Sequence, residues 1–496
     1  MAFIEVYCSL PQKDRMLTDL LLDRRRILIG GGVAAVLGLQ SRTFAGILQS
    51  STDPVFSVAD FGARSGAGQD DTRAIQAAIG AAERHGSGTV LIPGTYHCGN
   101  INISGSNIRV QGQAGSLVNG RLTIAPGASN IQVADLNMLD TRGDRRSFFL
   151  DVSGRNCRFT NLQLVKDPVA GGYQMYVRQP ADGCTFDGLK VHGSNGIMVA
   201  GRNHLFQNFE LISKMLNGAP GDDAFALKGI NDVTENIVIR NGIVRGAAAI
   251  VSIGSEIGTS KAGGGRGAVR NVTVENVTGD RCARLAFFKP GALDYDYHDG
   301  VVEQIRLRNL SLSDPEGQYF RCGIDMIAAR GAIIRDVQTS GISINARAMN
   351  RGVAPTAAIE IALLDKGAPA TIENIALQLK FADPYSGAPH GPDAPGYPVD
   401  HIVQIEKRNP DSGVMSGIVL DVDGRGSSLG GIAVGAGLDG AITLKRVRLT
   451  QVSTDSRSAQ GAGGIWSRSR LNLGDVQVTP ANGPRFGGSG FQGRAN

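Results

Sequence analysis

The stretch "NIVIRNGIV" at residues 236–244 returns with substitutions as "NVTVENVTG" at 271–279 and as "QIRLRNLSL" at 304–312. In each copy apolar and polar residues alternate, and an asparagine separates two apolar runs. Alternation predicts strands with one buried face, and asparagine tolerates the left-handed backbone that a bend requires. Each copy therefore predicts two short strands around a bend.

Further copies run from "NIRVQG" at 107–112 to "SRLNLGDVQV" at 469–478, at intervals of about 20 to 35 residues. One such unit cannot bury its apolar face alone, whereas a stack of units buries a continuous core. The intervals are short for propeller blades, and no helical pattern separates the copies. We expect an all-β fold, a right-handed parallel β-helix, in which asparagine side chains bond to those of the next coil.

The ends of the stack follow from other patterns. Residues 70–88, "DDTRAIQAAIGAAERHGSG", carry apolar residues at helical spacing and end in glycine, which predicts a helix that caps the N-terminal end. The single β-helix domain is expected over residues 53–480. The glycine-rich residues 481–496 are expected to form a flexible tail.

Residues 1–45 are interpreted as a twin-arginine export signal. Arg24 and Arg25 precede an apolar run from Ile27 to Leu39 that is too short to span a bilayer, and Ala45 follows as a small residue at the cleavage site. The alternative is a basic loop before a buried helix. The signal predicts a periplasmic or secreted protein that has no membrane partner after signal removal, and we expect a monomer.

Composition limits the partners and cofactors. A net charge of +5 spread over 496 residues gives no support for a nucleic-acid partner. Five cysteines outside the signal, without CxxC spacing, argue against a disulfide framework or a zinc site. Cys157 and Cys184 are expected to be buried apolar residues. The glycine-rich stretches lack the strand–loop–helix context of a phosphate site, so no organic cofactor is expected.

The paired acids Asp222 and Asp223 stand in "GDDAFALKG" at 221–229, after a Gly-Ala-Pro-Gly turn. They form either a solvated turn or a site that uses two acids. Consecutive strand residues point to opposite faces, so both side chains share one site only where the backbone bends. Close carboxyl groups raise each other's pKa, and one can then stay protonated as a general acid.

These motifs resemble a known family. The stretch from "FSVADFGARSGAGQDDTRAIQAAIGAA" at 56–82, together with "GDDAFALKG" and "IVSIGSE" at 250–256, is similar to pectin-type β-helix proteins, and within them to glycoside hydrolase family 28, the polygalacturonases. The resemblance covers roughly residues 53–310. It implies an inverting hydrolase site on the outside of the β-helix, made of three aspartates, a histidine and an Arg-x-Lys pair.

The family residues are only partly present in this chain. Asp222 and Asp223 match the paired acids, and Lys289 matches the lysine, with Arg284 displaced. Asn195, in "GSNGI", stands in place of the first aspartate, and Ala249 stands in place of the histidine.

The expected function is hydrolysis of an acidic, uronate-containing polysaccharide by an exported enzyme. Asp222 is the expected general acid, Asp223 the base, and Lys289 the cation that holds a substrate carboxylate. No metal site is expected in a hydrolase. The expected substrate-binding residues are Asn195, Lys228, Arg284, Tyr297 and His298.

Two alternatives remain at the sequence level. A polysaccharide lyase would cleave the same polymer by β-elimination, with bases from Lys289, Tyr295, Tyr297 or His298 and with calcium held by carboxylates. A non-catalytic glycan-binding β-helix would keep the fold without turnover. In "YQMYVR" at 173–178, Tyr173, Tyr176 and Arg178 are either a sugar platform or ordinary strand packing.

Overall fold

The structure, a computed structural model, describes residues 53–491 except 114, 145, 214–219, 293–296, 318, 348–356, 384–400, 427–429, 453–463 and 481–483. The predicted export signal lies outside the described residues. Within the described part, no helix has the length and apolar character needed to cross a membrane.

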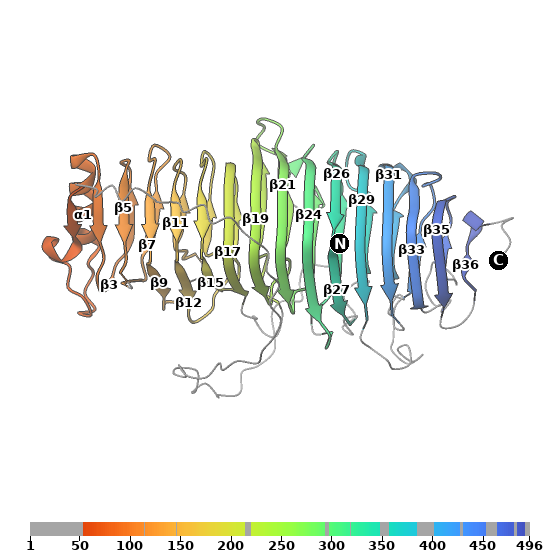
Figure 1. The fold of residues 1–496 in the computed structure, drawn as a ribbon. Helices are drawn as coiled ribbons and strands as arrows, with labels where there is room; N and C mark the ends of the chain where they lie inside the picture. Colours follow the sequence, from red (N-terminus) through yellow and green to blue (C-terminus); the bar gives the residue numbers. More distant parts are fainter. Residues whose placement is uncertain are drawn as a thin grey trace, which may run out of the picture. The chain divides into compact units, whose positions relative to one another are not determined.

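Two large sheets form the stack (Figure 1). The smaller sheet has 15 strands, and neighbouring strands along it come from successive coils of the chain. Its strands are β4 (Asn100–Ile103), β7 (Arg121–Ile124), β10 (Leu150–Val152), β13 (Met175–Val177), β16 (Ile197–Val199), β18 (Phe225–Ile230), β20 (Val251–Ser260), β22 (Arg284–Pro290), β23 (Tyr297–His298), β25 (Cys322–Ala328), β28 (Ala357–Leu363), β30 (His401–Lys407), β32 (Gly430–Val434), β34 (Ile465–Ser467) and β36 (Phe486–Gly487).

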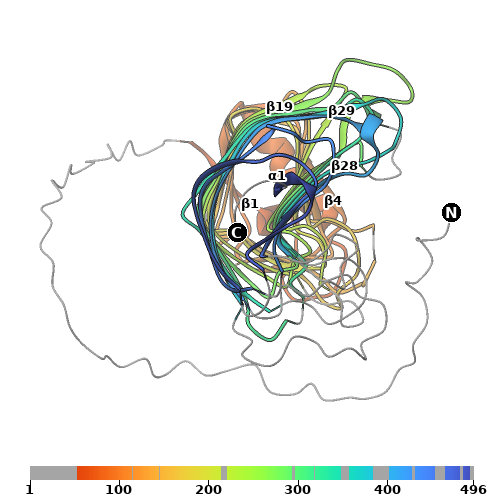
Figure 2. The same cartoon turned by 90° about the vertical axis from the view of Figure 1, so that its right-hand side faces the viewer.

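The larger sheet has 21 strands and curves around the remaining sides of the stack, as the end-on view shows (Figure 2). Its strands are β1 (Val55–Ser57), β2 (Gly88–Leu91), β3 (Thr95–His97), β5 (Ile108–Gln111), β6 (Ser116–Val118), β8 (Gln132–Ala134), β9 (Asn137–Asp140), β11 (Arg158–Thr160), β12 (Gln163–Lys166), β14 (Thr185–Asp187), β15 (Lys190–Gly193), β17 (Arg202–Ser213), β19 (Val233–Arg245), β21 (Ala268–Asp280), β24 (Val301–Asp314), β26 (Ile333–Ser340), β27 (Ile342–Ala346), β29 (Ala370–Ala382), β31 (Gly413–Arg425), β33 (Ile442–Val452) and β35 (Asn472–Pro480).

Neighbouring coils pair in parallel and in register. Strand β19 pairs with β21, and β21 with β24, so that Val238, Thr273 and Arg306 lie side by side. The one antiparallel pairing among the described strands joins β23 to the end of β20. This arrangement confirms the predicted right-handed parallel β-helix.

Asparagines form ladders at the bends, as the repeat predicts. Asn241, Asn276 and Asn309 have φ values of 56°, 55° and 51°, in the left-handed region. The Nδ2 of Asn276 donates to Oδ1 of Asn241 at 3.2 Å, and the Nδ2 of Asn309 donates to Oδ1 of Asn276 at 3.2 Å. The asparagine therefore supplies both the bend and a bond between coils.

Replacement of a ladder asparagine tests this account. We expect Asn276→Ala to lower the free energy of unfolding by about 1–2 kcal/mol, because a Cβ disfavours left-handed backbone. Asn276→Gly should cost less, since glycine adopts positive φ freely. Urea unfolding of both variants measures the difference. Equal losses would show that the amide bonds, and not the backbone conformation, dominate.

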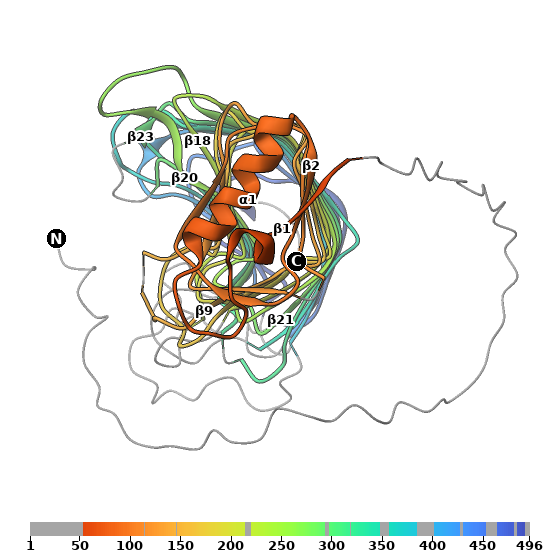
Figure 3. The ribbon, with the colours of Figure 1, turned by 90° about the vertical axis from the view of Figure 1, so that its left-hand side faces the viewer.

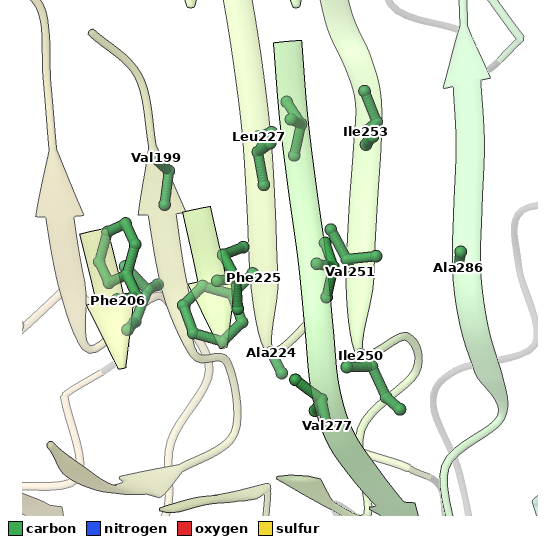
Figure 4. Close-up of a cluster of buried hydrophobic side chains, with 14 of the residues drawn as sticks. Val199, Phe206, Ala224, Phe225, Leu227, Ile250, Val251, Ile253, Val277 and Ala286 are labelled. Carbon is green, nitrogen blue, oxygen red and sulfur yellow. The ribbon is translucent and has the colours of Figure 1, made fainter. Parts of the chain in front are cut away.

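The interior is filled by stacked side chains from the inward faces of both sheets. The rings of Phe159, Phe186 and Phe206 stack with centroids 4.8 and 4.6 Å apart. Phe225, from the smaller sheet, meets Phe206 edge-on (Figure 4). Cys157 and Cys184 are buried free thiols in the same column of coils, as predicted.

The predicted cap is present at the N-terminal end (Figure 3). Helix α1 (Thr72–His85) buries Ile75, Ala78, Ile79 and Ala82 against the first coils and ends at Gly86. The 3₁₀-helix η1 (Val58–Phe61) precedes it, and two more, η2 (Pro410–Ser412) and η3 (Ser489–Phe491), occur near the C-terminal end.

Within the predicted tail, the structure describes residues 484–491, and these pack on the last coil. Phe486 and Gly487 form β36, which pairs in parallel with Ile465 and Trp466 of β34. The rings of Phe486 and Phe491 lie 5.0 Å apart and pack against the core. Backbone pairing and these two rings outweigh the flexibility that the surrounding glycines suggest.

Candidate active site

One row of side chains runs along the outer face of the smaller sheet. Parallel register aligns one outward residue from each coil, and inward residues such as Phe225 and Val251 alternate with them. We call this set the outward row. Its members from β10 to β28 are Asp151, Tyr176, Met198, Ala226, Ser252, Phe287, Asp325 and Glu360.

Asp222 and Asp223 stand just before β18, where the backbone is held from both neighbouring coils. The N–H of Asp222 donates to the carbonyl of Ser194 at 2.7 Å, and the N–H of Ala224 donates to the carbonyl of Ala249 at 2.8 Å. A Cβ on Gly221 would lie 2.4 Å from the Ser194 carbonyl oxygen, so only glycine fits this approach. These contacts therefore fix the backbone conformation at Asp222 and Asp223, where the sequence predicts a bend.

The carboxyl group of Asp222 meets two donors. Nδ2 of Asn195 donates to its Oδ2 at 2.6 Å, and the N–H of Asp223 donates to its Oδ1 at 2.9 Å. Burial of the carboxyl group by surrounding protein raises the pKa of Asp222, and the negative charge of Asp223 raises it further. The Asp223 N–H, Lys289 and Lys228 oppose this rise without cancelling it. Asp222 is thus biased toward its protonated form while part of the residue stays exposed.

Asp223 lies deeper and is paired with a cation. Nζ of Lys289 lies 3.3 Å from Oδ2 of Asp223, and the two side chains are 10% and 5% exposed. The ammonium also lies 4.5 Å from the centroid of the Phe287 ring. The contact brings an ammonium group directly against the buried Asp223 side chain. The two acids are therefore placed in different environments, which suits one acid and one base.

Lys228, on β18, is the second buried lysine near the paired acids. Its Nζ donates to the carbonyl of Gly254 at 2.9 Å and forms an ion pair with the Glu256 carboxylate. Its positive charge acts on Asp222, which places it within electrostatic reach of the acids. Glu256 was not among the predicted site residues, although it ends the "IVSIGSE" motif.

Tyr173 borders the acids from an earlier coil. Burial raises the pKa of its hydroxyl strongly, and the negative charges of Asp223, Asp222 and Glu256 add to the rise. The raised pKa favours the protonated hydroxyl, which donates hydrogen bonds. The ring lies 5.6 Å from that of Tyr176. Of the two readings of "YQMYVR", the structure favours a surface next to the site over packing in the core.

Arg284 is paired with a carboxylate of the next coil. It is 6% exposed, its Nε donates to Oδ2 of Asp325 at 2.8 Å, and its guanidinium lies 4.2 Å from the Phe287 centroid. A buried carboxylate one coil further on thus engages Arg284, and its role in substrate binding stays a prediction.

Tyr297 and His298 are also placed elsewhere. They form β23, where Tyr297 pairs with Ser260 and His298 with Thr259, at the C-terminal end of β20. His298 Nδ1 lies 2.7 Å from Oδ2 of Asp299. The structure therefore does not bring either residue to the paired acids. Tyr295, the remaining predicted base, lies outside the described residues.

A second polar group lies further along the outward row. Sγ of Cys322 and one carboxylate oxygen each of Asp325 and Glu360 lie within 4.8 Å of one another. All three residues are buried, and atoms of these types can bind a metal ion. Arg284 binds one oxygen of Asp325, while the other has no hydrogen-bond partner among the described residues. Burial and then the charge of Asp325 raise the pKa of Glu360 to about 7 from its ordinary value of 4.5.

This group makes stability depend on pH. Between pH 4.5 and about 7 the folded protein keeps the Glu360 proton that the unfolded chain releases. The free energy of unfolding should therefore fall as pH rises through this window, by up to about 3 kcal/mol. Urea unfolding of Glu360→Gln should show a correspondingly flatter profile. Glu303→Gln, which alters a surface ion pair with Arg335, is the matched control and should keep the steeper profile.

Sequence comparisons identify no relative. No protein-family model matches the chain, and no curated protein matches it. The fold and the site define the class as a parallel β-helix with an acid pair on its outer face.

Solved structures show similar backbones at low identity. A family 28 exopolygalacturonase from Yersinia enterocolitica is 12% identical over 86% of this chain and 79% of its own, with a TM-score of 0.49. A tailspike protein double mutant of the E. coli bacteriophage HK620 is 13% identical over 85% and 80%, with a TM-score of 0.49. An exopolygalacturonase from Thermotoga maritima is 13% identical over 67% and 88%, with a TM-score of 0.41. At 12–13% identity these structures do not assign roles to the side chains of this protein, so the roles proposed below are argued from the contacts described above.

Proposed function

We propose that this protein is a glycoside hydrolase that cleaves a uronate-containing polysaccharide at Asp222 and Asp223. One observation carries the proposal: two neighbouring carboxyl groups have contrasting surroundings. The pKa of Asp222 is raised by burial and by Asp223, whereas Asp223 is paired with Lys289. Inverting hydrolysis needs one carboxyl group that acts as acid and one that acts as base, and this contrast in surroundings suits such a pair.

In the proposed reaction Asp222 donates its proton to the leaving glycosidic oxygen as the carbon–oxygen bond breaks. A water molecule attacks the anomeric carbon from the opposite face and passes a proton to the Asp223 carboxylate. Asn195 holds one oxygen of Asp222 and orients the carboxyl group. Lys289 holds Asp223 in place through the 3.3 Å contact between its Nζ and Oδ2 of Asp223. Attack from the opposite face inverts the anomeric configuration.

The site favours hydrolysis over β-elimination. A lyase needs a base beside the acidic sugar carbon. Tyr173, the tyrosine next to the acids, has a strongly raised pKa, and the ammonium of Lys289 is engaged by Asp223. His298 and Tyr297 pair with the far end of β20. We further propose that the twin-arginine segment exports the protein, as a monomer, to the periplasm or the medium.

A panel of uronate polysaccharides tests the proposal, with reducing ends and ultraviolet absorbance followed together. Reducing ends without new absorbance, formed by the native protein and not by Asp222→Asn, are expected. Absorbance that rises with reducing ends would show an unsaturated product and therefore a lyase. Binding without turnover in either protein would show the glycan-binding alternative. Proton NMR of the first product should show the inverted anomer.

A further inference from the structure

A cavity of about 230 Å³ opens on the outer face of the smaller sheet, on the N-terminal side of the acids. Arg121 of β7 and Phe148, just before β10, form two of its walls. We call it the arginine pocket. Its lining includes Asn100, Arg121, Arg142, Arg146, Ser147 and Phe148.

Positive charge predominates around the arginine pocket. Nε of Arg121 donates to the neutral Oδ1 of Asn100 at 2.9 Å. Nε of Arg142 binds Asp140 at 3.1 Å, and the exposed Arg146 has no ion-pair partner within the part of the chain that the structure describes. Below, the buried Lys166 donates to the carbonyl of Ser147 at 2.6 Å.

Among the described residues, two carboxylates oppose Arg121, Arg142 and Arg146, while burial lowers the pKa of Lys166 below its ordinary value. Asp140 is 2% exposed and is engaged by Arg142 and Ser147, and Asp144 lies on the pocket wall. Arginine presents its donors in a planar fork that matches a carboxylate. The pocket therefore suits an anionic group of small size.

A row of aromatic rings joins the pocket to the acids. The rings of Phe148 and Tyr176 lie 4.8 Å apart, and those of Tyr176 and Tyr173 lie 5.6 Å apart. Guanidinium groups cover two of these rings, Arg121 at 4.8 Å from Phe148 and Arg178 at 4.1 Å from Tyr176. The charges of Asp222 and Asp223 in turn raise the pKa of the Tyr173 hydroxyl. Because each guanidinium group covers one ring face, a sugar would contact the opposite faces or the edges of Phe148 and Tyr176.

The spacing of the coils sets the length of ligand that would reach both places. Strands β7, β10, β13, β16 and β18 are successive neighbours in the sheet. At roughly 4.8 Å per strand, the pocket and the acids lie about 14–19 Å apart along the sheet. A single sugar cannot span this interval, so a ligand that occupies both must be an oligosaccharide.

We propose that the arginine pocket is a remote subsite that binds the carboxylate of a uronate unit in the same chain that is cut at Asp222 and Asp223. The inference rests on the proposed function for the cutting step. Binding at the pocket itself requires only the arginines and the aromatic row.

The test uses calorimetric titration in the Asp222→Asn background, so that turnover does not obscure binding. The probes are hexasaccharides of galacturonate, glucuronate and mannuronate, each beside its methyl ester. The pocket variant carries Arg121→Gln and Arg146→Gln. Arg308→Gln, an exposed arginine on the outside of the larger sheet, is the matched control.

We expect the pocket variant to weaken binding of at least one free-acid hexasaccharide about tenfold to a hundredfold, as loss of charged hydrogen bonds implies. The ester, the corresponding disaccharide and the control variant should show no such change. Equal losses for acid and ester, an unchanged affinity in the pocket variant, or no binding of any hexasaccharide would overturn the subsite. Arginine-dependent binding by a protein that never cleaves would keep the subsite and refute the proposed hydrolysis.

Discussion

Asp222→Asn should lower kcat by about 10²- to 10⁴-fold while substrate binding is retained. The amide fills the same space but has no proton to give to the leaving oxygen. The alkaline limb of the rate profile should also vanish. In the native protein this limb should lie above the usual aspartate range, because burial and Asp223 raise the pKa of Asp222.

A substrate with a good leaving group isolates the acid role. A nitrophenyl glycoside needs little protonation, so Asp222→Asn should slow its cleavage far less than that of the polysaccharide. Asp223→Asn should slow both substrates alike, since water activation is needed in each case. Asp421→Asn, on the outside of the larger sheet, is the control and should leave both rates unchanged. Equal effects of Asp222→Asn on the two substrates would contradict its role as general acid.

Lys289→Met should destabilise the protein by about 3–5 kcal/mol and abolish activity. The substitution leaves Asp223, whose side chain is 5% exposed, as a buried charge without its ion-pair partner. Urea unfolding and polysaccharide turnover measure the two effects.

The double variant Asp223→Asn with Lys289→Met is the matched control. Removal of both charges relieves the unpaired carboxylate, so most of the lost stability should return while activity stays absent. If the losses in stability simply add, the pair does not interact as the 3.3 Å contact implies.

Features that lie within one coil could be predicted from the sequence. The asparagines of the repeat supply left-handed bends and ladders, as at Asn241 and Asn276. Asp222 and Asp223 are adjacent in the chain, and their turn is visible as Gly-Ala-Pro-Gly. Asn195 and Lys289 were found because each belongs to a recognisable motif.

Side-chain contacts between residues far apart in the sequence could not be predicted in the same way. Arg284 binds Asp325, 41 residues away, and this pairing depends on how many residues each intervening loop contains. Tyr173 reaches the acids for the same reason. The polar stretch at 289–300 suggested a site by composition alone, yet its Tyr297 and His298 pair with the end of β20.

The in-register pairing of coils also bears on how such a chain can change over generations. A gain or loss of one residue inside β18 would turn the later half of that strand inside out, and selection would remove it. Duplication or deletion of a complete coil between the arginine pocket and the acids instead keeps each side chain on its face of the sheet and changes the interval between the two places. Descendants of this protein should therefore differ by entire turns or by loop insertions, and each gained turn would lengthen the smallest oligosaccharide able to touch both places.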